Sequence, residues 1–95
     1  MDLRNIINQA DTTLIDVRAP FEYVMGHVAG AKNIPLRDIP NRMEEIRQLN
    51  GPVVVYCRSG ARSAQAMAFL RAQGIQQVYN GGGLEEVEAY IEQVC

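Results

Sequence analysis

A hydrophobic segment that ends in a cysteine and a loop of small residues constrains this chain more than any other feature. Residues 53–56 read Val-Val-Val-Tyr, Cys57 follows at once, and a helical pattern begins near Ala61. Successive β-branched residues without polar alternation are typical of a strand that is covered on both faces of a parallel sheet. We therefore expect Cys57 at the carboxyl end of a buried strand, close to the N-terminus of the helix that follows.

The rest of the chain alternates short strand and helix patterns. The patterns predict strands at 13–17, 31–34, 53–56 and 77–79, and helices at 2–9, 21–25, 39–49, 61–73 and 84–94. This alternation predicts an α/β fold of three layers, in which a central parallel sheet of four or five strands has helices on both faces. The glycines at 81–83 are interpreted as a tight turn that brings backbone near the cysteine loop. Ligands of such sheets bind beyond the carboxyl ends of the strands, where Cys57 is expected.

Length and composition limit the classes of function. The 95 residues are enough for one domain, 1–95, and the net charge of −2 provides no basic surface for nucleic acid. No apolar run is long enough to cross a bilayer, and no signal peptide is visible at the N-terminus, so we expect a cytoplasmic protein if the chain is complete. One histidine and two cysteines provide no metal-ligand spacing, so we expect no metal and no cofactor.

The loop after Cys57 has the composition of an anion-binding site. Backbone N–H groups of the loop and of the first helical turn can converge on the sulfur, and the helix dipole adds positive potential there. Arg58 and Arg62 add two full charges. Most lone cysteines are small hydrophobic residues of a core, but a buried strand end has no structural need for two arginines around a glycine. We therefore interpret Cys57 as a thiolate nucleophile.

Three sequence blocks together resemble the single-domain rhodaneses, which are thiosulfate sulfurtransferases. The first block is Leu14-Ile15-Asp16-Val17-Arg18, with Glu22-Tyr23, Gly26-His27-Val28-Ala29-Gly30-Ala31 and Asn33-Ile34-Pro35 after it. The second is the cysteine loop that precedes a helix, and the third is Val78-Tyr79-Asn80-Gly81-Gly82-Gly83 before the last helix. The resemblance spans most of the chain and implies the rhodanese-like form of the three-layer fold.

The resemblance implies a ping-pong sulfur transfer through a persulfide on Cys57. The donor is thiosulfate or a related sulfane compound, the acceptor is cyanide or a thiol, and a protein donor or acceptor is also compatible with it. Cys57 is the expected catalytic residue. The expected substrate-binding residues are those of the loop and first helical turn: Arg58, Ser59, Gly60, Ala61, Arg62 and Ser63.

Two other functions are alternatives to sulfur transfer. Related phosphatases and arsenate reductases place an arginine six residues after the cysteine, and this chain has Ser63 at that position. A non-catalytic interaction module of the same fold often lacks the cysteine, and this chain retains it together with both arginines. The loop therefore favours a sulfurtransferase over either alternative.

Other residues receive a supporting interpretation. Asp16, Arg18 and Glu22 are predicted to form a charged cluster that orients the loops, and His27 is predicted to hold a loop by binding backbone rather than to act as a base. Many relatives have tryptophan after the glycines, where this chain has Leu84, and Cys95 is expected to be an exposed terminal thiol. Four residues near the loops are predicted to form the rim of the site and to set donor specificity: Val24, Met25, Arg37 and Leu84.

Overall fold

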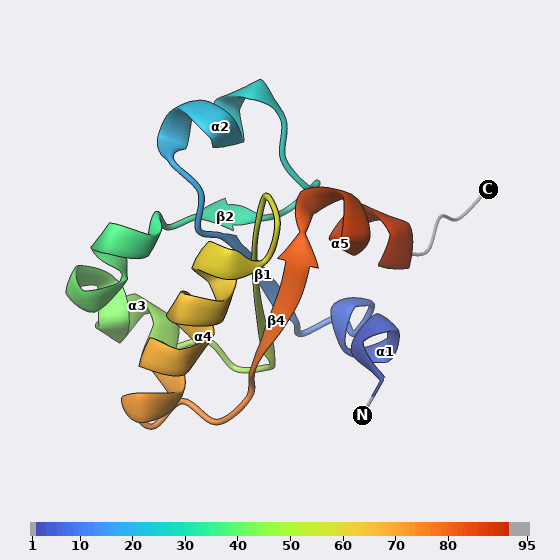
Figure 1. Cartoon of the computed structure of the whole chain (residues 1–95). Coiled ribbons are helices and arrows are strands. Elements are labelled where there is room, and N and C mark those ends of the chain that lie inside the picture. The colour runs from blue at the N-terminus through green and yellow to red at the C-terminus, as the bar shows by residue number, and fades with distance from the viewer. Residues whose placement is uncertain (1, 92–95) are drawn as a thin grey trace.

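The computed structural model describes residues 2–91 and has a single parallel sheet of four strands at its centre (Figure 1). The strands are β1 (Thr13–Asp16), β2 (Lys32–Asn33), β3 (Val53–Cys57) and β4 (Val78–Gly83). Their order across the sheet is β2-β1-β3-β4, and every neighbouring pair is parallel. The predicted α/β fold is confirmed, with four strands.

Helical segments cover both faces of this sheet. They are α1 (Leu3–Ile7), α2 (Pro20–Met25), the 3₁₀ helix η1 (Leu36–Arg42), α3 (Met43–Arg47), α4 (Ala61–Ala72) and α5 (Leu84–Tyr90). In Figure 1, α3 and α4 lie on one side of the sheet, α1 and α5 on the other, and α2 stands beyond the end of the strands. None of the helices within residues 2–91 has the length and apolar character needed to span a membrane.

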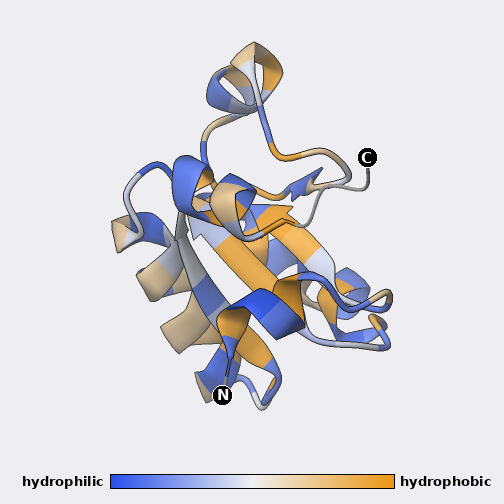
Figure 2. Cartoon of the chain, turned by 90° about the vertical axis from the view of Figure 1, so that its right-hand side faces the viewer, coloured by the Kyte–Doolittle hydropathy of each residue, from blue (hydrophilic) through white to orange (hydrophobic). Residues whose placement is uncertain are grey.

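Strand β3 is buried on both of its faces, as its composition predicts. Val53, Val55 and Cys57 belong to a core shared with η1, α3 and α4. Val54 and Tyr56 belong to a second core shared with α1 and α5. Side chains alternate between the two faces of a strand, so an uninterrupted apolar run is what two cores require. Figure 2 shows these hydrophobic strands enclosed by more polar helices.

The glycines at 81–83 differ from the prediction, because they form the end of β4 rather than a tight turn. Cys57 pairs with Gly83, and the register shifts by one residue between Val55 and Tyr56, which leaves Gly81 as a bulge. Gly83 lies so close to the loop that a Cβ there would collide with the carbonyl oxygen of Arg58. A glycine strand therefore lets the sheet continue directly beside the cysteine loop.

The predicted helix at 39–49 was also wrong in part. The segment begins earlier as the 3₁₀ helix η1, and the α-helical hydrogen-bonding pattern starts only at Met43. Pro40 has no N–H to donate, which disfavours an α-helix through that position. The end of the predicted helix at 84–94 and the prediction for Cys95 fall on residues 92–95, outside the described part of the chain.

The hydroxyl of Tyr56 connects β3 to the loop after α2. Tyr56 is fully buried, and its hydroxyl accepts a hydrogen bond from the backbone N–H of Val28 at 3.0 Å. Burial raises the pKa of Tyr56, and the neighbouring Asp16 carboxylate raises it further. The phenol therefore stays neutral and keeps its hydrogen bonds across the ordinary pH range.

We expect Tyr56→Phe to lower the free energy of unfolding by about 1–2 kcal/mol, because it leaves the buried Val28 N–H without its partner. Denaturant titration measures this change. Tyr79→Phe, at a half-buried position of β4 opposite Val54, is the matched control and should change stability by less than about 0.5 kcal/mol. Equal effects of the two substitutions would contradict the assignment.

Candidate active site

The carboxyl ends of the four strands bring the predicted site residues to one edge of the sheet. Asp16, Asn33, Cys57 and Gly83 are the last residues of β1, β2, β3 and β4. A cleft of about 580 Å³ opens at this edge. Its walls come from the loop after β1, α2, the cysteine loop, the end of β4 and α5: Arg18, Phe21, Glu22, Met25, Arg58, Gly83, Leu84, Glu85 and Glu86. The sheet thus places Cys57 beside the site where ligands of parallel sheets bind.

The sulfur of Cys57 is enclosed by the loop that follows it and by the first turn of α4. The residue is only 1% exposed. The backbone N–H of Gly60 donates to Sγ at 3.0 Å, and the hydroxyl oxygen of Ser63 lies 3.5 Å from it. The loop therefore presents hydrogen-bond donors to a sulfur that only a slender reagent can reach.

The pKa of Cys57 reflects a competition between burial and these hydrogen bonds. Burial raises the pKa, because it disfavours the charged thiolate. The Ser63 hydroxyl and the backbone N–H groups of Ser63, Gly60 and Ser59 lower it by a larger amount, to about 7. Near neutral pH a large fraction of the sulfur is therefore the nucleophilic thiolate.

The turn into α4 depends on Gly60. Its φ of 100° lies in the left-handed region, and a Cβ there would approach the Cα of Gly82 to 3.3 Å. The glycine therefore reverses the chain while its own N–H still points at the sulfur. Ser59 and Ala61 are exposed, Gly60 is half-buried, and Ser63 is fully buried in the first turn of α4.

Asn80 of β4 belongs to this site, although no role was predicted for it from the sequence. Its side-chain oxygen accepts hydrogen bonds from the Ser63 hydroxyl at 2.6 Å and from the Gly82 N–H at 2.9 Å. Its side-chain nitrogen donates to the carbonyl of Gly60 at 3.2 Å. The available signal was a polar residue at the carboxyl end of a strand next to glycines, but its partners depend on strand order.

Arg62 is held by Glu22 rather than being free to meet a ligand. Its two terminal nitrogens donate to the two oxygens of Glu22 at 2.7 and 3.1 Å. Glu22 also accepts the N–H of Ala19 at 3.1 Å, so the pair joins α4 to the start of α2. The ion pair neutralises much of the positive charge that the sequence analysis attributed to Arg62.

Arg58, unlike Arg62, has a side chain that is not held by a carboxylate of the described chain. It is exposed and lines the cleft. Within residues 2–91 its side chain forms no ion pair, unlike that of Arg62. Of the four predicted rim residues, Met25 and Leu84 line the cleft, and Val24 and Arg37 do not.

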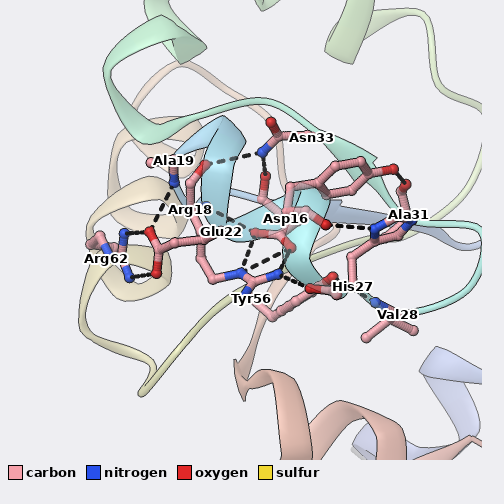
Figure 3. A network of polar contacts seen from close by, with 12 residues as sticks. Asp16, Arg18, Ala19, Glu22, His27, Val28, Ala31, Asn33, Tyr56 and Arg62 are labelled. Atoms are coloured by element: carbon pink, nitrogen blue, oxygen red, sulfur yellow. Dashed lines mark hydrogen bonds and ion pairs between the residues drawn. The ribbon is translucent and has the colours of Figure 1, made fainter.

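Asp16 and Arg18 form a buried ion pair at the end of β1 (Figure 3). The two nitrogens of Arg18 nearest the carboxylate donate to it at 2.6 and 2.9 Å, and a terminal nitrogen also donates to the carbonyl of Gly26 at 2.7 Å. The side chain of Asn33 donates to the carbonyls of Asp16 and Arg18, at 3.0 Å each. These contacts fix the loop that carries α2. Glu22, which was predicted in the same cluster, pairs with Arg62 instead.

His27 follows the end of α2 and packs back on that helix. Its Nδ1 donates to the carbonyl of Tyr23 at 2.8 Å, and its ring stacks on the Tyr23 ring with centroids 3.7 Å apart. The contacts hold the end of α2 and give the histidine no part in the cysteine loop. No group of three His, Cys, Asp or Glu residues suited to a metal ion occurs within residues 2–91.

We expect Glu22→Gln to remove about 1 kcal/mol of stability at neutral pH, a modest figure because the Arg62 side chain is 38% exposed and screened by water. The hydrogen bond from Arg62 lowers the pKa of Glu22 from 4.5 to about 2. The carboxyl has a lower pKa in the folded than in the unfolded state, so its contribution is present above about pH 4.5 and is lost as the pH falls toward 2.

Denaturant titrations of both proteins at several pH values measure this contribution. The stability difference should shrink as the pH falls through that window. A difference that stays constant with pH would contradict the ion pair. Glu44→Gln, in α3 and outside the ion pairs of the described chain, is the matched control.

The chain is similar to known proteins over most of its length. A family model described as a Rhodanese-like domain matches residues 1–90, so the chain belongs to the rhodanese-like family. It is 43% identical over 77 residues to a sulfurtransferase of Allochromatium vinosum, a match that covers 81% of this chain and 71% of that protein. It is 42% identical over 74 residues to the thiosulfate sulfurtransferase PspE of Escherichia coli, covering 77% and 71% of the two chains.

A solved structure described as a rhodanese with anions from E. coli superposes with a TM-score of 0.72 at 41% identity, covering 79% of this chain and 89% of that one. Other relatives are longer. The chain spans about half of the Bacillus subtilis protein YqhL, since the match covers 52% of it, and 32% of a tRNA uridine(34) hydroxylase of Buchnera aphidicola. The sulfurtransferase relatives support a rhodanese-family enzyme and sulfur transfer of the rhodanese type.

Proposed function

We propose that this protein transfers sulfane sulfur from a small anionic donor such as thiosulfate to cyanide or a thiol, with Cys57 as the carrier. The observation that carries the proposal is the position of the Cys57 sulfur, 3.0 Å from the Gly60 N–H in a loop that lowers its pKa to about 7. The thiosulfate sulfurtransferase name of the E. coli relative supports the choice of donor.

The first step is attack of the Cys57 thiolate on the outer sulfur of thiosulfate. The new bond joins the two sulfurs, the S–S bond of thiosulfate breaks, and its electron pair leaves with sulfite. In the second step cyanide or a thiolate attacks the outer sulfur of the Cys57 persulfide, and the bond to Cys57 breaks to restore the thiolate. Neither step needs a general base, because the Cys57 thiolate and the acceptor, cyanide or a thiolate, each attack as an anion.

The loop would stabilise charge in both steps. The N–H groups that face the thiolate can also face the terminal sulfur of the persulfide, in the manner of an oxyanion hole. Arg58, exposed at the cleft, is the cation best placed to attract the donor, since Arg62 is paired with Glu22. The burial of Cys57 favours a donor with a slender sulfur tip.

A phosphatase is less compatible with this loop. Phosphatases of related fold need an arginine at the position of Ser63 to bind phosphate oxygens. Here the Ser63 side chain is buried and hydrogen-bonded to Asn80, so nothing cationic reaches the ligand from that position. The geometry thus favours a sulfur anion over a tetrahedral oxyanion.

We expect intact-protein mass spectrometry to show a gain of one sulfur atom after incubation with thiosulfate, and cyanide to reverse the gain. Cys57→Ala should show no gain. Cys95→Ala is the matched control and should load as the unmodified chain does. Loading that persists in Cys57→Ala would overturn the assignment of the carrier.

An absence of loading on the unmodified chain would reject thiosulfate as the donor. The non-catalytic interaction module would then be the leading interpretation if persulfides of small thiols also failed to load Cys57. Hydrolysis of an aryl phosphate by the same preparation would instead support the phosphatase.

We expect Arg58→Ala to raise the KM for thiosulfate roughly tenfold, which corresponds to the loss of about 1.4 kcal/mol of charge-assisted binding. Steady-state assays at low ionic strength measure the change. Arg37→Ala removes an exposed arginine of η1 that does not line the cleft, so its KM should be unchanged. Equal KM changes in the two variants would indicate general electrostatic attraction instead of a contact from Arg58.

A further inference from the structure

The hydroxyl of Ser63 lies between two hydrogen-bond acceptors. Its oxygen is 2.6 Å from the side-chain oxygen of Asn80 and 3.5 Å from the sulfur of Cys57. A serine hydroxyl has one proton, so it can donate to only one of the two at a time. The acceptor that receives this proton therefore affects how strongly a negative charge on the Cys57 sulfur is stabilised.

The orientation of the Asn80 amide is fixed by two other contacts. Its nitrogen donates to the carbonyl of Gly60 at 3.2 Å, and its oxygen accepts the N–H of Gly82 at 2.9 Å. A flipped amide would place oxygen against the Gly60 carbonyl and nitrogen against the Gly82 N–H, which removes both bonds. The group that faces Ser63 is therefore an acceptor, and the contact of 2.6 Å requires the serine proton.

We infer that Asn80 is a positioning residue that competes with the Cys57 sulfur for the single proton of the Ser63 hydroxyl. When the sulfur is neutral, the hydroxyl donates to Asn80, and its lone pairs face the thiol. When the sulfur is anionic, it is the stronger acceptor, and the hydroxyl turns toward it. Each thiolate that forms therefore gains the hydrogen bond of the Ser63 hydroxyl, and Asn80 loses it.

This exchange tunes the reactivity of Cys57. A thiolate that is stabilised too strongly becomes a weaker nucleophile, and the best attacking thiol has a pKa near the ambient pH. By holding the hydroxyl, Asn80 offsets part of the stabilisation that the loop provides. The site then keeps a thiolate population at neutral pH without making the sulfur inert.

A consequence for turnover rests on the proposed function. In the persulfide the inner sulfur is neutral, so the hydroxyl returns to Asn80 and the loop N–H groups face the outer sulfur. When an acceptor attacks the outer sulfur, the inner sulfur leaves as a thiolate, and the hydroxyl turns to it as the bond breaks. Ser63 and Asn80 thus adjust to the charge on the leaving group.

Other charged groups surround the loop. Arg58 belongs to the loop itself, and Arg62 of α4 is paired with Glu22 of α2. Asp16 and Arg18 form their ion pair at the end of β1. Glu86 of α5 accepts the Gly83 N–H at 3.0 Å beside β4. A test must separate the effect of the Ser63 proton from the fields of these groups.

A double-mutant cycle makes that separation. The pH midpoint of thiolate formation is measured by ultraviolet absorbance in the unmodified protein, Asn80→Ala, Ser63→Ala and the double variant, each corrected with the matching Cys57→Ser protein. Effects of Asn80→Ala on loop structure or on surrounding charges occur in both backgrounds and cancel in the comparison.

We expect Asn80→Ala to lower the midpoint by about one pH unit when Ser63 is present, because the hydroxyl is then free to donate to the thiolate. In the Ser63→Ala background the same substitution should leave the midpoint unchanged. A midpoint that rises or stays constant with Ser63 present would overturn the inference. So would an equal shift in both backgrounds.

Asn80→Asp provides a second test if the alanine variant does not fold. Its carboxylate is a stronger acceptor for the hydroxyl, so it should raise the midpoint more in the presence of Ser63 than in its absence. An equal rise in both backgrounds would contradict the competition. These midpoints do not depend on sulfur transfer, whereas the failure of thiosulfate to load Cys57 would show up only in the mass measurement.

Discussion

The hydrogen bond from the Gly60 N–H to the Cys57 sulfur, 3.0 Å long, is the contact around which the molecule is arranged. It requires a buried strand that ends at the sulfur, a left-handed glycine that turns the chain, and a helix whose first turn adds further N–H groups. Two hydrophobic cores hold the strand from both faces. The fold thereby keeps an anion in a place where burial alone would make it unstable.

The charged residues around the sulfur have different roles. The Arg62–Glu22 pair joins α4 to α2, and the Asp16–Arg18 pair holds the loop that leads into α2. These pairs supply geometry, while Arg58 remains exposed at the cleft. An arginine close to a nucleophile in sequence can therefore serve structure, and only its partners in space reveal which role it has.

The sequence predicted the parts of the site that depend on local order. The apolar run at 53–56, Cys57 directly after it and the helix from Ala61 are neighbours in the chain, and the alternation of elements placed them at the carboxyl edge. Contacts between distant segments were not predictable. Glu22 and Arg62 are 40 residues apart, and Asn80 reaches Ser63 because β4 pairs with β3 in the sheet. The glycines that resembled a turn form a strand for the same reason.

The central claim is that the Ser63 hydroxyl and the backbone N–H groups of the loop hold Cys57 as a thiolate near neutral pH. The most direct test follows the amide resonance of Gly60 by NMR during a pH titration. The account predicts a large shift of this resonance with a midpoint at about pH 7, absent in Cys57→Ser. A midpoint near 9, the ordinary value for a thiol, or a Gly60 resonance that ignores the ionisation of Cys57, would contradict it.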